Sequence, residues 1–152
     1  MNTETLATLA GMAQWTGSNM AYNLAKIPAD KLDWKPSPEA NSALEIINHL
    51  MMPLNGIPAM LEGRAPEKFE AATDLESAQA LIRDASEKYA AFVSALAPES
   101  LQGTLDMPFG GTWPRERVVT LPIFDLVHHH GQIAYIQTLL GDAESHFEEL
   151  GN

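Results

Sequence analysis

The chain contains no cysteine, which excludes disulfides, thiolate metal ligands and a cysteine nucleophile. It also lacks an apolar run near the roughly 18 residues that a membrane-spanning helix needs. The first residues lack the basic segment and the long apolar core of a signal peptide. From these absences we expect a cytoplasmic protein that has no membrane partner.

Basic residues are scarce as well. Nine Lys and Arg residues stand against 20 Asp and Glu residues, and the formal net charge is -11. A surface with this charge repels phosphate backbones and anionic membrane surfaces. We therefore expect no nucleic acid among the partners of this protein.

Four stretches of the chain carry apolar residues at helical spacing. With 152 residues, one domain spanning residues 1–152 is expected, large enough to bury about two thirds of its surface. Residues that interrupt helices follow each stretch: Pro28, Gly63, Pro98 and Gly141. The pattern predicts helices over about residues 3–26, 42–62, 73–97 and 120–141.

Local signals refine the ends of these helices. Capping boxes are predicted for Ser42 with Glu45, and for Thr73 with Glu76. Paired glycines at residues 110–111 favour a tight turn, so a short hairpin or an irregular loop is expected before the last helix. The predicted fold class is all-α, a four-helix bundle with this loop over one end. The interior of such bundles commonly holds metal sites.

Four of the five histidines lie in two places: His49 in the second predicted helix, and His128, His129 and His130 in the fourth. Asp125 precedes His129 by one helical turn, so the two side chains share a face. If His49 faces that point from its own helix, two imidazole nitrogens and one carboxylate oxygen can hold a divalent transition metal with open positions. We therefore predict His49, Asp125 and His129 as metal ligands.

Each of these residues also has a structural interpretation. His49 on an apolar helix face could be a hydrogen-bonded core histidine, and Asp125 could accept a bond from His49 or His129 in a site without metal. His130 points about 100° away from His129 around the helix, and is expected with His146 at the surface or at an interface.

Two neighbouring residues bear on the predicted ligands. Pro53 has no N–H to donate to the carbonyl of His49, so the helix is expected to bend there and orient His49 toward the bundle axis. Gln132 lies about one helical turn after both His128 and His129, and could steady either ring as a hydrogen-bond partner.

Three motifs resemble the DinB-like (DinB/YfiT) superfamily: SALEIINHL at residues 42–50, HHGQI at residues 129–133 and LLG at residues 139–141. Residues 27–36, with Ile-Pro and Leu-Asp-Trp-Lys-Pro, resemble the segment between the first two helices of that family. The resemblance covers about the whole chain. It implies a four-helix bundle with a long crossover, frequent dimers, and a metal held by three histidines. It also implies transferases that use bacillithiol, mycothiol or glutathione.

Carried over by position, His49 and His129 match two ligands of the family. Asp125 lies where the third histidine is usual, and His130 lies where arginine is usual. Asp is an ordinary ligand for Zn, Ni, Mn or Fe, so the resemblance still implies a divalent transition metal as cofactor. The missing arginine removes a guanidinium that would hold an anionic substrate.

Two functions remain open. One is a metal-dependent transferase or hydrolase acting on a small-molecule substrate, in which the metal lowers the pKa of a bound thiol or water. The attacking sulfur would come from a small thiol cofactor, and His128 is the predicted catalytic base, or alternatively a further ligand. The other is a non-catalytic bundle with a degenerate metal site that binds a small molecule or a protein. A homodimer is expected too, because Ala and Met exceed the needs of one core.

Overall fold

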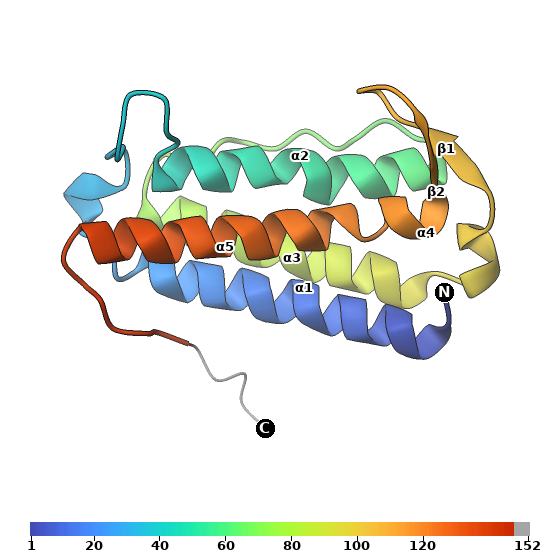
Figure 1. Cartoon of the computed structure of the whole chain (residues 1–152), viewed down its shortest axis with the longest axis horizontal. Helices are drawn as coiled ribbons and strands as arrows, with labels where there is room; N and C mark the ends of the chain where they lie inside the picture. The colour runs from blue at the N-terminus through green and yellow to red at the C-terminus, as the bar shows by residue number, and fades with distance from the viewer. Residues whose placement is uncertain (148–152) are drawn as a thin grey trace.

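The computed structural model describes residues 1–147 and shows four long helices packed side by side (Figure 1). They are α1 (Thr3–Leu24), α2 (Ala43–Glu62), α3 (Leu75–Ala95) and α5 (Leu121–Leu139). The predicted four-helix bundle is confirmed, with helix ends within about two residues of the expected ones. No helix within residues 1–147 is long and apolar enough to cross a membrane.

The segment before the last helix forms a hairpin followed by a short helix. Strands β1 (Thr104–Asp106) and β2 (Thr112–Pro114) pair antiparallel, and α4 (Arg115–Val118) follows directly. The turn places two consecutive glycines at φ of 100° and 83°, which explains why residues 110–111 are glycine. Of the two forms that the sequence allowed here, the structure contains the hairpin. The connections also contain 3₁₀ turns at Ala29–Lys31 and Pro98–Leu101.

The order of the helices around the bundle differs from their order along the chain. Both α1 and α2 pack against α3 and α5, so α1 and α2 lie on opposite corners. In Figure 1, α1 and α5 run in one direction, α2 and α3 run in the other, and residues 63–74 return along α2 to the far end. This crossover makes α2 and α5 direct antiparallel neighbours. Residues far apart in sequence therefore meet between these two helices.

The helix caps confirm one prediction and correct another. Ser42 and Glu45 form the predicted capping box of α2. The expected box of Thr73 with Glu76 is wrong, because Asp74 caps α3 and Ser77 is its partner. The Asp74 carboxylate accepts a bond from the Ser77 backbone N–H at 2.8 Å. Asp is a stronger N-cap than Thr, which moves the first turn by one residue.

Helices α1 and α3 approach each other closely at Gly17. A Cβ atom built at this glycine would lie 2.0 Å from Ser86 Oγ and 2.4 Å from Ser86 Cβ. Both distances are far inside van der Waals contact, so only glycine allows this helix spacing. One turn further along α3, the buried Tyr89 hydroxyl donates to the carbonyl of Val119 and joins α3 to the segment before α5.

Residues 142–147 fold back against α1 instead of leaving the bundle. Asn23 of α1 donates to the carbonyl of His146 at 3.1 Å, and Phe147 stacks on Trp15 with ring centroids 5.9 Å apart. Asn23 also contacts His130 Nε2 at 3.1 Å. The sequence predicts that His130 and His146 lie at the surface or at an interface. In the structure each is half-buried, where the C-terminal segment packs against this side of α1.

Candidate metal centre

The packing of α2 against α5 brings the rings of His49 and His129 together. Their centroids are 5.1 Å apart, with an angle of 69° between the ring planes. The His129 ring is buried, whereas His49 is exposed to solvent. Two imidazoles on one tetrahedral ion, with metal–nitrogen distances near 2.1 Å, have centroids about 5 Å apart. The spacing of the two rings thus fits a shared divalent metal.

Asp125 lies on α5 one turn before His129 and is half-buried. Its charge raises the pKa of the His129 ring and so partly opposes the lowering by burial. Ligand atoms around a tetrahedral ion lie about 3.4 Å apart. Within residues 1–147, Asp142, Glu144 and His146 form the only group of three such residues whose ligand atoms all lie within 4.8 Å of one another. Binding at the predicted set would therefore need side chains to rearrange, and the set stays a prediction.

A hydrogen-bonded chain on α5 determines which nitrogen of His129 is free. His129 Nδ1 lies 2.6 Å from Gln132 Oε1, and Gln132 Nε2 lies 3.1 Å from His128 Nε2. A carbonyl oxygen only accepts, so Nδ1 of His129 carries the proton and donates it. The lone pair then resides on Nε2, as in a metal-ligating histidine whose other nitrogen is held by a hydrogen bond. Contact of Gln132 with both rings confirms its predicted partner role.

Burial keeps this ring neutral. Desolvation is the main influence that lowers the pKa of His129, and the nearby His49 and His128 lower it further. The Gln132 hydrogen bond and the Asp125 charge act in the opposite direction, without cancelling the effect. A neutral imidazole is the form that binds metals, so the environment favours the binding-competent state of His129.

His128, the predicted base, is exposed on the same helix. Its ring lies 4.9 Å from that of His129, measured between centroids. The N–H of the Gln132 amide points at His128 Nε2, so this nitrogen already accepts a hydrogen bond. To take a proton from a substrate, His128 has to release Gln132 first. In the present arrangement it orients Gln132 and, through it, His129.

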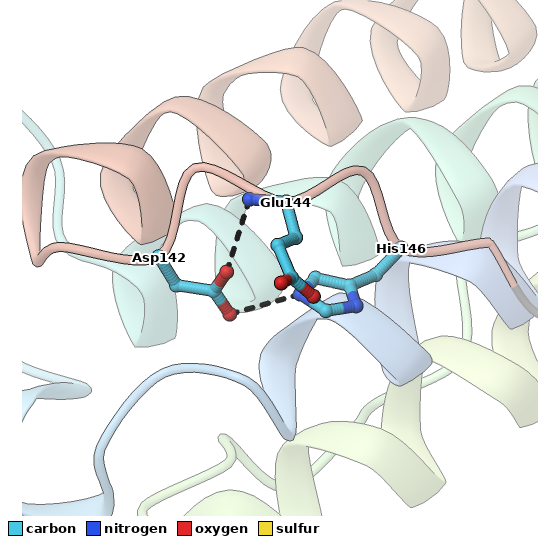
Figure 2. A group of neighbouring side chains, drawn as sticks. All are labelled: Asp142, Glu144 and His146. Carbon is cyan, nitrogen blue, oxygen red and sulfur yellow. Dashed lines mark hydrogen bonds and ion pairs between the residues drawn. The ribbon is translucent and has the colours of Figure 1, made fainter.

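A second acidic cluster, which the sequence analysis missed, lies after α5 (Figure 2). Asp142 accepts from the Glu144 backbone N–H at 3.1 Å and pairs with His146 Nε2 at 2.9 Å. The backbone bond is the main cause of the lowered pKa of Asp142. The alternating Asp-x-Glu-x-His pattern at residues 142–146 is the signal in the sequence from which this cluster could have been predicted. Because both carboxylate oxygens of Asp142 already have partners, a turn that closes the end of α5 accounts for the cluster.

Asp125 also faces a cavity of about 590 Å³ between α2, the hairpin loop and the start of α5. Pockets of roughly 300–1,000 Å³ hold typical small-molecule ligands. The predicted ligand set and this cavity therefore share one residue. A small molecule bound in the cavity would have one end at the candidate metal centre.

Comparison with known proteins places the chain in a family. The model of the DinB superfamily matches residues 12–133. A DinB-like protein from Bacillus subtilis, YjoA, has a similar structure with a TM-score of 0.74 at 21% identity, over 92% of this chain and 96% of that one. YfiT from Bacillus subtilis also has a similar structure, with a TM-score of 0.74 at 13% identity, over 93% of this chain and 90% of that one. It is described as a probable metal-dependent hydrolase with an unusual four-helix bundle topology.

A third similar structure is a DinB-like protein from Bacillus cereus, with a TM-score of 0.69 and 14% identity over 88% of this chain and 91% of that chain. None of the curated proteins compared with the chain matches it. At these identities the solved structures support the fold, and the family match covers most of the sequence. The chain belongs to the DinB superfamily.

Proposed function

We propose that this protein is a divalent-metal-dependent enzyme that acts on a small molecule. The observation that carries the proposal is the pair of His49 and His129 rings, 5.1 Å apart, beside a carboxylate that lines a cavity. The free Nε2 and the lowered pKa of His129 support the role of this ring as a ligand. The description of YfiT as a probable metal-dependent hydrolase agrees with it.

In this proposal His49, Asp125 and His129 hold the ion, and Gln132 keeps His129 in its ligating tautomer. A divalent metal such as Zn, Ni, Mn or Fe would lower the pKa of a bound thiol or water and so supply a nucleophile near neutral pH. His128 takes the proton of that nucleophile once its ring has released Gln132. The cavity beside Asp125 holds the electrophile and excludes bulk water from it.

The proposed reaction is the transfer of a low-molecular-weight thiol. The sulfur lone pair forms a bond to an electrophilic carbon of the substrate, and the leaving group departs with the electron pair of the bond that breaks. The proton of the thiol goes to His128. The absence of cysteine means that this sulfur has to come from a separate thiol cofactor. Hydrolysis follows the same course, with water in place of the thiol.

This reaction is tested with metal-loaded protein, chlorodinitrobenzene as electrophile, and bacillithiol, mycothiol or glutathione as thiol. We expect the wild type to accelerate release of chloride, and the His49→Ala and Asp125→Asn variants to lose most of that acceleration. Asn keeps the size of Asp125 and removes its charge. Equal rates for the wild type and both variants would reject catalysis by this centre.

One observation favours a second candidate, a bundle that binds a small molecule without catalysis. The ligand atoms of the predicted set are farther apart than 4.8 Å in at least one pair, as expected for a site that has lost its metal. Asp125 in place of a histidine would then mark the loss. Metal analysis of protein purified without added metal separates the two candidates, because only the enzyme has to retain an ion.

We also propose that the protein is a homodimer through the exposed face of α1 and α5. This face carries Met12, Phe124 and Val127 with exposed fractions of 42%, 70% and 50%. Together with Leu9 and Ile123 they line a shallow apolar groove between the two helices. An apolar face of this kind on neighbouring helices is typical of an interface between subunits.

Light scattering is expected to give twice the monomer mass of 16.6 kDa at micromolar concentration. Phe124→Asp should shift the protein to the monomer mass, because it places a charge in the interface. Phe69→Asp is the matched control, since Phe69 is an exposed aromatic residue on the connection between α2 and α3. A wild type with the monomer mass at all concentrations contradicts the proposal.

A further inference from the structure

The cavity of about 590 Å³ beside Asp125 is built almost entirely from apolar groups. One wall is the second half of α2, and the opposite wall comes from the hairpin loop and the start of α5. The side chains that define its character are Met52, Ile57, Met60, Met107, Phe109 and Leu121. Three of these are methionines, whose flexible thioethers adapt to apolar ligands of different shape.

Two residues of the lining carry charge, Arg64 and Asp125. The Arg64 guanidinium is held by Glu62, with Nε 2.6 Å from the carboxylate, and also donates to the carbonyl of Ala65 at 3.3 Å. Its charge is therefore balanced by Glu62. The remaining charge, on Asp125, is negative and repels an anionic ligand. A carboxylate or phosphate group inside this cavity would lose its water without gaining an unpaired cation, since Arg64 is already paired with Glu62.

The backbone of α2 leaves room that a side chain could occupy. A Cβ atom built at Gly56, which lines the cavity, meets no other atom within 4 Å. A larger residue at this position therefore extends into the cavity without a clash at its first atom. Replacement of a helical glycine also favours the helix, so Gly56 is a position where the cavity can be filled while the fold is kept.

We infer that this cavity binds the uncharged, apolar body of the substrate, an aryl or alkyl group, with its reactive end toward Asp125. The assignment of this ligand as the substrate rests on the proposed function. Binding of uncharged apolar molecules in the cavity does not rest on that function, because it depends on the lining alone. Two separate measurements distinguish binding in the cavity from the role of the metal centre.

The first measurement uses the whole metal-free chain and prodan, an uncharged naphthyl ketone whose fluorescence increases in apolar surroundings. We expect saturable binding of one prodan per chain, displaced by methyl naphthoate. Gly56→Leu should weaken binding by about tenfold or more, because the leucine side chain occupies the cavity. Gly11→Leu is the matched control, since this helical glycine also has free space around it but lies on α1. Its affinity should equal that of the wild type.

Charge selectivity is measured by competition. Methyl naphthoate and naphthoate have the same ring system and differ in the carboxylate charge. We expect the ester to displace prodan and the anion to compete at least about tenfold more weakly, because the lining offers it no free cation. Equal competition by the anion, or unchanged affinity in Gly56→Leu, overturns the inference.

The second measurement adds Ni²⁺ to the prodan complex. If His49, Asp125 and His129 hold the ion, it lies next to the occupied cavity and should quench the bound probe. His129→Ala should abolish the quenching and leave prodan affinity unchanged. Prodan binding without quenching in the wild type contradicts the metal centre and retains the apolar cavity. Quenching by the ion without selective displacement by the uncharged ester would support the metal centre and overturn the inference about the apolar cavity.

Discussion

The His129→Ala variant is expected to lose binding of one divalent metal ion per chain. In the wild type, Nδ1 of His129 donates to Gln132, so Nε2 carries the free lone pair. The His129 ring is also the buried member of the predicted ligand set. Loss of a residue that orients a ligand lowers metal affinity by about 10–100-fold, and loss of the ligand itself should exceed that. Calorimetry with Zn²⁺ or Ni²⁺ measures both affinity and stoichiometry.

Two further variants make this prediction specific. Gln132→Ala should lower the affinity by about 10–100-fold, since His129 then loses the partner of Nδ1. His146→Ala tests the alternative cluster of Asp142, Glu144 and His146, and should leave the affinity unchanged. Loss of metal binding in His146→Ala, with retention in His129→Ala, would place the metal at the end of α5 and contradict the centre proposed between α2 and α5.

Gly17→Ala is expected to destabilise the fold by about 3 kcal/mol or more, at the upper end of the range for overpacked cores. The added methyl group would lie 2.0 Å from Ser86 Oγ and 2.4 Å from Ser86 Cβ, so α1 and α3 have to separate. The first of these atoms can rotate away, whereas Ser86 Cβ is attached to the helix backbone. Urea denaturation followed by circular dichroism gives the change in the free energy of unfolding.

The control for this variant is Gly11→Ala on the same helix. A Cβ at Gly11 meets nothing within 4 Å, so this change should stabilise the protein by about 0.5–1 kcal/mol through helix propensity alone. Adding Ser86→Gly to Gly17→Ala removes both atoms that clash and should recover part of the lost stability. If Gly17→Ala and Gly11→Ala have the same effect, the close approach of α1 and α3 is not tight in solution.

Most of the fold was predictable because its signals are local. Periodic apolar residues and the residues that interrupt helices located the four long helices to within a few residues. The Ser42 capping box was identified in the same way. The error at α3 arose where Thr73 and Asp74 are both capable N-caps, and their relative strength decided the position. Local patterns do not reveal what covers a surface, so the packing of residues 142–147 against α1 and His130 was not predicted.

The candidate site was predictable in part. Helical spacing correctly placed Asp125, His129 and Gln132 on one side of α5, since this depends on the helix period alone. That His49 would face them depended on α2 and α5 being neighbours, which the crossover of residues 63–74 brings about. The resemblance to the DinB-like family implied that arrangement, and the spacing of residues did not.

The sequence by itself determined the helices, their caps, the excess of acidic residues and the absence of any cysteine sulfur, because each depends on residue type or on short-range hydrogen bonds. Only the tertiary structure decided the 5.1 Å spacing of the His49 and His129 rings and the burial that keeps His129 neutral. It also decided the apolar cavity at Asp125. These properties arise where segments remote in sequence pack together. The physical reason is that desolvation and contact distances depend on all the neighbours of a side chain, and most of those neighbours lie on other helices.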